Sequence, residues 1–136
     1  MTQEEKQLLL KDLCGRLPYN PYIFLEEDNI RTLLTSIEVD KYGFTEIWYE
    51  GTPYSIEDVK AYLRPMSSMT EEELKEFYMV EGMDTNPVIL NKPQYDWHFT
   101  TNGIDYLLSR HFDFRGLIPM GLALEATEGM YKTEQI

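Results

Sequence analysis

The densest group of residues that could do chemistry is the run HFDFRG at residues 111–116, which holds an imidazole, a carboxylate and a guanidinium. Such a set can serve acid–base chemistry or bind an anion. The same residues also suit a packed helix end, in which His111 compensates the helix dipole and Arg115 pairs with Asp113 or with backbone carbonyls. Phe112 and Phe114 would then anchor the turn in the core. We favour this structural interpretation, because such clusters are common at helix ends.

A second candidate is the aromatic run YDWHF at residues 95–99, in a stretch without a clear hydrophobic period. Tyr and Trp side chains often form the hot spots of recognition surfaces. They can equally cover a sheet as part of the core, and both interpretations stay open. The residues predicted to contact a partner or ligand are Tyr95, Trp97, His98, His111, Asp113 and Arg115.

The motifs of known cofactor sites are missing from the sequence. It contains neither the G-x-x-x-x-G-K-[ST] phosphate loop nor the G-x-G-x-x-G dinucleotide turn. His98 and His111 are its only histidines, too few and too widely spaced for a structural zinc site. Cys14 could pair with a histidine as a nucleophile, but its place beside an apolar helix stripe predicts a buried thiol. We therefore expect no catalytic residue, cofactor or metal, although a site of two histidines and a carboxylate stays open.

Charge is the strongest compositional signal. The chain of 136 residues carries 24 acidic residues against 12 Lys and Arg, for a net charge of -12. Proteins that grip nucleic acid through its phosphates need clustered Lys and Arg, and here the basic residues are scattered singly. The same argument disfavours an anionic membrane surface. The acidity either serves solubility, or forms a face that docks a basic partner or mimics DNA.

The expected compartment is the cytoplasm. Cys14 is the only cysteine, so no intramolecular disulfide is possible and nothing indicates an oxidising compartment. The longest early apolar run, Leu8 to Leu10, is too short for a signal peptide. A membrane span would need about twenty apolar residues in a row.

Four helices are expected. Thr2 with Glu5 forms a capping box for a first helix that must end near Pro18. Thr70 with Glu73 caps another, which holds three acidic residues in its first turn and is closed by Gly82.

The other two helices have weaker signals. Ser55 with Asp58 predicts a short helix bearing Ile56, Val59 and Leu63, which ends because Pro65 crowds Arg64. Asn102 caps a last helix through Asp105.

Strands occupy the segments between the helices. The residue types favour strands at Tyr22 to Leu25, Leu33 to Val39 and Phe44 to Glu50, with a hairpin turn at residues 40–43. Short strands are also expected at Val88 to Leu90 and Leu122 to Glu125. The connections are too short for helical crossovers. The predicted fold is therefore a single α+β domain of residues 1–136, with a small antiparallel meander packed against three or four short helices.

Three stretches carry a resemblance to a known group. The runs VKAYLRPMSSMTEEE at residues 59–73 and IDYLLSRHFDFRGLIPMGLALEATEGMY at residues 104–131 resemble small proteins of gut Bacteroidales and their prophages. The opening EEKQLLLKDLCGRLPY at residues 4–19 is similar to the start of the same group. No activity is known for that family, so the resemblance carries over no catalytic residue. It implies a bacterial or phage cytoplasm and a mobile-element setting.

The leading functional hypothesis is a small, acidic, non-enzymatic interaction or accessory protein encoded by a prophage or other mobile element, with another protein as its partner. One alternative is a small-molecule-binding enzyme or hydrolase that uses His111, Asp113 and Arg115. Another is an acidic DNA mimic. The oligomeric state does not follow from the sequence.

A stability measurement separates the structural and functional interpretations of Arg115. If its guanidinium bonds within the fold, Arg115→Ala should lower the free energy of unfolding by roughly 1 to 3 kcal/mol, the usual cost of leaving a charged hydrogen-bond partner unpaired. A thermal melt of the variant that overlays the parent curve would contradict the structural role.

Overall fold

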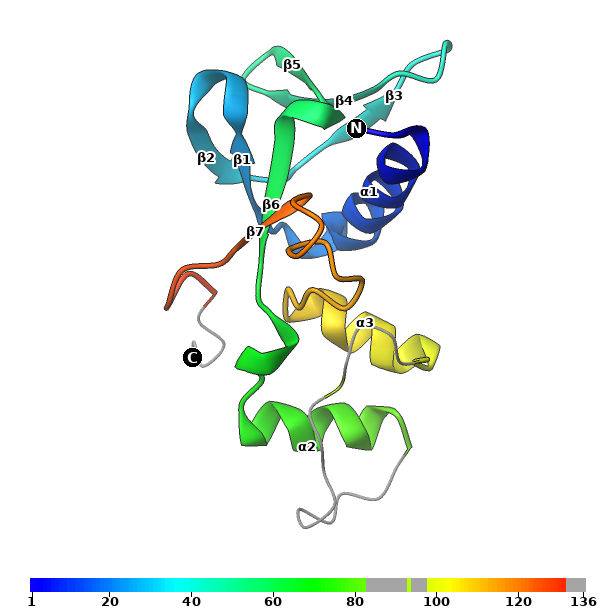
Figure 1. Ribbon diagram of the computed structural model, residues 1–136, viewed down its shortest axis with the longest axis vertical. Helices are drawn as coiled ribbons and strands as arrows, with labels where there is room; N and C mark the ends of the chain where they lie inside the picture. Colours follow the sequence, from blue (N-terminus) through cyan, green and yellow to red (C-terminus); the bar gives the residue numbers. More distant parts are fainter. Residues whose placement is uncertain (83–92, 94–97, 132–136) are drawn as a thin grey trace. The chain divides into compact units, whose positions relative to one another are not determined.

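The computed structural model describes residues 1–82, 93 and 98–131 (Figure 1). They form two compact units. Unit 1 comprises Met1–Tyr62 with Leu122–Leu124, and unit 2 comprises the described residues of Leu63–Gly121 with those from Glu125 onward. Helices and two small sheets with mostly antiparallel pairs together confirm the predicted α+β class. The single domain of residues 1–136 stays a prediction, because compact units of this kind need not be separate folding domains.

The first helix forms as predicted. Helix α1 spans Gln3–Arg16 in unit 1, and Thr2 caps it. The Thr2 hydroxyl accepts from the Glu5 N–H at 3.1 Å, and the Glu5 carboxylate accepts from the Thr2 N–H at 2.8 Å, which completes the capping box. The helix ends two residues before Pro18 and buries Leu9 and Leu13.

One sheet has four strands in the order β2-β1-β6-β7. These strands are β1 (Tyr22–Leu25), β2 (Ile30–Leu33), β6 (Val59–Leu63) and β7 (Ala123–Glu125). Strand β1 is antiparallel to both β2 and β6. The predicted bounds of β1 are confirmed, and β7 lies within the expected closing strand.

The second sheet is an antiparallel meander of three strands, β3 (Ile37–Val39), β4 (Thr45–Tyr49) and β5 (Thr52–Ser55). The predicted turn at residues 40–43 joins β3 to β4. Its shape comes from Asp40, whose carboxylate accepts from the backbone N–H groups of Tyr42 and Phe44, both at 2.9 Å. Gly43 supplies the left-handed φ of +85° that closes the turn.

The predicted strand Leu33 to Val39 is wrong, because the chain changes sheets in its middle. Leu34 is fully buried, and its N–H donates to the Pro21 carbonyl at 2.8 Å. The Asn20 side chain also donates to the Leu34 carbonyl at 2.9 Å. These bonds to the segment before β1 end β2 at Leu33, so the expected alternation along one strand is lost.

The predicted helix from Ile56 to Leu63 is also wrong. Ser55 does cap a turn, since its hydroxyl accepts from the Glu57 N–H, but the turn is a 3-10 helix of only Ile56–Asp58. Strand β6 then begins at Val59 and pairs with β1. Its buried and half-buried residues alternate with period two, so sheet pairing overrode the helical spacing.

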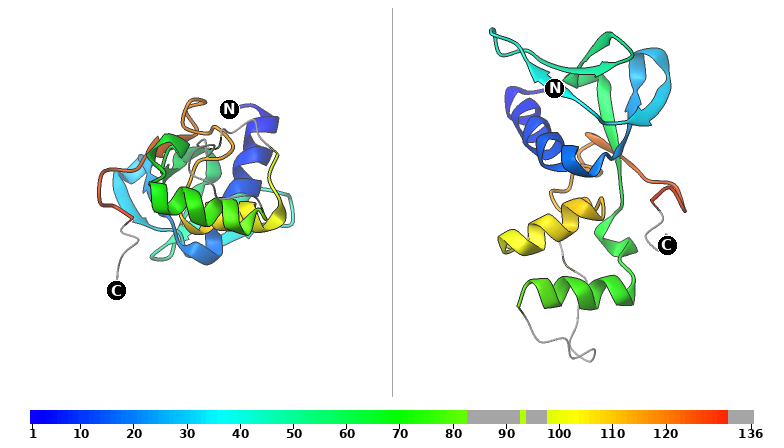
Figure 2. Two further views of the ribbon diagram at one scale, coloured as in Figure 1. Left: turned by 90° about the horizontal axis from the view of Figure 1, so that it is seen from below. Right: turned by 180° about the vertical axis from the view of Figure 1, so that it is seen from behind.

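Unit 2 contains two packed helices, α2 (Glu71–Val80) and α3 (Thr101–Ser109), which lie against one another (Figure 2). The predicted capping box of Thr70 and Glu73 starts α2, and Gly82 follows its end with a φ of +76°. An apolar cluster fills the space between the helices and the turn that follows α3: Met66, Met69, Leu74, Phe77, Tyr78, Leu107, Leu108, Phe112 and Phe114.

The cap of α3 differs from the prediction. Thr100, not Asn102, is the N-cap, and its hydroxyl accepts from the Gly103 N–H at 3.0 Å. Thr100 also donates through its N–H and its hydroxyl to the Glu81 carboxylate, at 2.9 and 2.7 Å. A Cβ on Gly103 would lie 1.8 Å from that carboxylate. Glu81, just beyond α2, therefore fixes where α3 begins and needs the space that glycine leaves.

Two expectations fall on residues that the structure does not describe. They are the strand at Val88 to Leu90 and the aromatic side chains of Tyr95 and Trp97.

Unit 1 buries an ion pair within α1. The Arg16 guanidinium donates to both oxygens of the Asp12 carboxylate, at 2.7 and 3.1 Å, and both side chains are 0 % exposed. The pair spans one helical turn, and its bidentate geometry compensates the loss of water around both ions.

We expect Arg16→Met to destabilise the protein by about 3 to 5 kcal/mol, because the Asp12 carboxylate would stay buried without its guanidinium. The double variant Asp12→Leu/Arg16→Met should lose less than the sum of the two single losses, since no isolated charge remains. Urea unfolding of the four proteins measures this coupling. Additive losses would show that the pair contributes nothing as a pair.

Candidate functional site

The predicted cluster at residues 111–116 is built as a packed turn after α3. Phe112 and Phe114 are buried, as the structural interpretation expects. The Asp113 carboxylate is also buried and accepts from the backbone N–H groups of Leu117 and Ile118, at 2.8 and 2.9 Å. Both carboxylate oxygens thus hold the turn rather than face an open cleft.

Three of the other predicted residues, Arg115, His111 and His98, lie in the part of the chain that the structure describes. Arg115 lies over the Phe114 ring, with its guanidinium carbon 4.4 Å from the ring centroid. His111 has a left-handed φ of +66°, and its ring stacks on Tyr131 at 3.8 Å. His98 is exposed. The Arg115→Ala loss stays a prediction.

Other chemical candidates can be placed as well. Cys14 is exposed on α1, so the expectation of a buried thiol is wrong. The buried apolar residues of α1 include Leu9 and Leu13, and Cys14 lies outside them. Among the described residues, no three His, Cys, Asp or Glu side chains are grouped so as to hold a metal ion.

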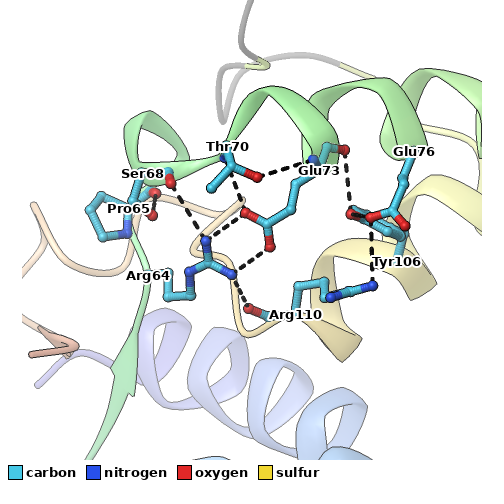
Figure 3. A network of polar contacts seen from close by, with 8 residues as sticks. All are labelled: Arg64, Pro65, Ser68, Thr70, Glu73, Glu76, Tyr106 and Arg110. Carbon is cyan, nitrogen blue, oxygen red and sulfur yellow. Dashed lines mark hydrogen bonds and ion pairs between the residues drawn. The ribbon is translucent and has the colours of Figure 1, made fainter. Parts of the chain in front are cut away.

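A polar network in unit 2 centres on Arg64 and Glu73 (Figure 3). The guanidinium donates to both carboxylate oxygens, at 2.7 and 2.8 Å. Glu73 also accepts from the Thr70 N–H as part of the capping box. Arg64 lies 4.2 Å from the centroid of the Phe112 ring. The ion pair is largely shielded from solvent, since the side chains of Arg64 and Glu73 are only 14 % and 5 % exposed.

The backbone of Arg64 makes a second set of bonds. Its N–H donates to the His111 carbonyl at 2.8 Å, and its carbonyl accepts from the Asp113 N–H at 2.8 Å. Burial raises the pKa of the Glu73 carboxyl, but the hydrogen bonds from Arg64 and Thr70 outweigh burial and leave that pKa below its usual value of 4.5. The network is therefore a structural clamp that holds its acid ionised.

An open groove lies in unit 1. A groove of about 720 Å³ runs between the first turns of α1 and the β3–β4 hairpin, and Figure 1 shows the N-terminal end of α1 beside these strands. Its lining mixes polar and apolar side chains from α1, the hairpin and the segment after β5, among them Gln3, Lys6, Leu10, Phe44, Glu46 and Ile56. A volume of this size suits a small molecule or the side chains of a docked segment.

Large apolar side chains stand exposed at the hairpin. Tyr42 is 75 % exposed, Phe44 is 69 % exposed and Val39 is 55 % exposed. Tyr42 and Phe44 line the groove. Single exposed apolar residues are ordinary, whereas contiguous exposed apolar patches often mark binding surfaces.

The electrostatics of the groove are acidic. Asp40, Glu46 and Glu57 contribute carboxylates, and Lys6 contributes one ammonium group. Lys6 forms an ion pair with Glu57 across the groove, and its hydrogen bond and charge lower the pKa of Glu57. Because Lys6 is committed to Glu57, the carboxylate of Glu46 has no ion-pair partner among the described residues.

Sequence reasoning did not select any of these groove residues. The hairpin turn was predicted, but its aromatic residues were assigned to the turn and the adjoining strand without a role. A usable signal was present, because Tyr42 and Phe44 flank Gly43 in a turn, where polar residues usually stand.

The clamp generates a pH-dependent prediction. Glu73→Gln should lower the free energy of unfolding by roughly 3 kcal/mol near neutral pH, because Arg64 loses its buried anion. A carboxyl with a lowered pKa stabilises the fold fully above about pH 4.5, its unfolded value, and this stabilisation is lost as the pH falls through the folded value.

The difference between parent and variant should therefore shrink as the pH falls below 4.5. Denaturant unfolding from neutral to acidic pH measures it, with the exposed Glu72→Gln in the same helical turn as control. A difference that stays constant with pH would contradict the role of the ionised pair.

None of the helices in the described residues combines the length and the apolar character needed to cross a bilayer. Comparison of the chain with protein-family models, with curated proteins and with solved structures found no match.

Proposed function

We propose that this chain is a non-enzymatic interaction protein that docks a segment of a partner protein in the groove between α1 and the β3–β4 hairpin. The observation that carries the proposal is the exposure of Tyr42 and Phe44 on the rim of that groove. Aromatic side chains supply much of the binding energy at protein interfaces, because they bury a large area and have few rotamers to order.

The architecture supports a binding role for a second reason. The hairpin that displays the aromatic residues is braced by the two backbone bonds to Asp40 and by the pairing of β3 and β4. Because such a hairpin is ordered before binding, it loses little further conformational entropy when a partner binds, which favours affinity. The groove wall opposite is a regular helix capped at Thr2.

The proposal also fits the electrostatics. A net charge of -12 opposes contact with nucleic acid phosphates, so a protein partner is the better match. A cytoplasmic setting, which the single cysteine favours, and an accessory role in a prophage or mobile element belong to this proposal.

Selection of random peptides displayed on phage, with the protein immobilised, tests the docking role. We expect enriched peptides whose binding falls about tenfold or more on Tyr42→Ser or Phe44→Ser, the effect typical of an aromatic hot spot. Both side chains are mostly exposed, so these variants should keep the melting temperature of the parent within the small range usual for surface changes.

Tyr19→Ser is the matched control, since Tyr19 is also exposed in unit 1 but does not line the groove. It should bind the selected peptides as the parent does. The proposal is wrong if no peptide is enriched, or if the enriched peptides bind the Tyr42→Ser/Phe44→Ser double variant as tightly as the parent.

A further inference from the structure

Two carboxylates face each other in the sheet that forms the groove. Glu38 in β3 and Glu46 in β4 are direct cross-strand partners in an antiparallel pair. Side chains in such positions project on the same side of the sheet with Cβ atoms roughly 5 Å apart, and like charges there destabilise the pairing. The hairpin therefore carries a built-in electrostatic cost.

Nothing in the described part of the chain offsets this cost. Neither carboxylate forms a hydrogen bond or ion pair with a described residue, and Lys6, the cation that lines the groove, pairs with Glu57. Glu46 also has a cross-strand partner on the other neighbouring strand, Ser55 in β5. Glu46 and Ser55 both line the groove, and Glu38 lies one strand beyond them, next to the lining residues.

We infer that the partner segment is basic, and that one of its Lys or Arg side chains seats between Glu38 and Glu46 while its apolar side chains contact Tyr42 and Phe44. This inference rests on the proposed function, because it names the chemistry of the segment docked there. A cation placed between the two carboxylates is attracted by both, and these two attractions outweigh the repulsion between the acids. Apolar contacts at Tyr42 and Phe44 would thus lie near a pair of carboxylates, one of which, Glu46, lines the groove.

The negative charge of the chain favours a basic partner segment over a second copy of the chain or an acidic peptide. A second copy would bring the same acidic groove and a further net charge of -12, so self-association at this face is opposed. An acidic peptide is opposed for the same reason. A basic segment gains from local pairing at Glu38 and Glu46 and from long-range attraction during encounter.

The peptides selected on the groove provide the probes. Those that depend on Tyr42 and Phe44 should carry a Lys or Arg close to their apolar residues. Synthetic copies with that residue changed to Gln should bind the parent protein about three- to tenfold more weakly at roughly 0.15 M salt. This is the loss in affinity expected when a partly exposed ion pair is removed from an interface.

The double variant Glu38→Gln/Glu46→Gln should weaken the unchanged peptide by the same factor and abolish the difference between the Lys and Gln peptides. Glu71→Gln/Glu72→Gln is the control, because it removes the same charge from exposed positions that do not line the groove. It should leave that difference intact. Without peptide, Glu38→Gln/Glu46→Gln should melt above the parent, since the repulsion is gone.

Three other outcomes overturn the inference. Groove-dependent peptides without a required Lys or Arg, or peptides rich in Asp or Glu, would show that the groove docks a segment but does not select a basic one. A peptide whose Lys-to-Gln loss is unchanged in Glu38→Gln/Glu46→Gln would place the cation elsewhere. If no selected peptide depends on Tyr42 and Phe44, the docking role itself has failed and this inference fails with it.

Discussion

Unit 2 depends on the pairing of Arg64 with Glu73. Arg64 contributes its backbone to the turn after α3, through His111 and Asp113, and its guanidinium to the first turn of α2. Two charges removed from water are costly unless each is fully compensated. Here the carboxylate also accepts the capping bond from Thr70, and the guanidinium rests on Phe112. The start of α2 and the turn after α3 must therefore form together.

Much of the fold was predictable where local chemistry decides it. The capping boxes at Thr2 and Thr70 and the turn closed by Gly43 each depend on a few neighbouring residues, and all three are confirmed. The errors arose where distant residues decide. Val59 to Leu63 fits a helix by spacing and a strand by alternation, and only the pairing with β1 selects the strand. Leu34 was misassigned because its bonds to Asn20 and Pro21 interrupt the strand.

The candidate site was less predictable than the fold. Residue type drew attention to His111, Asp113 and Arg115, yet a turn needs the same groups to satisfy its backbone, as Asp113 does. The groove residues are ordinary in type. Their importance comes from exposure and from strand register, which places Glu38 opposite Glu46. Neither property can be read from a single sequence without the pairing of β3 with β4.

The exposed thiol of Cys14 has a practical consequence. On α1, the groove-lining residues Gln3, Gln7 and Leu10 recur at helical spacing, and Cys14 continues that series about one turn beyond Leu10. Because it is the only cysteine of the chain, a maleimide dye attaches at one defined position next to the end of the groove. Its emission would then report occupancy of the groove in real time, with no engineered residue and no change to the lining itself.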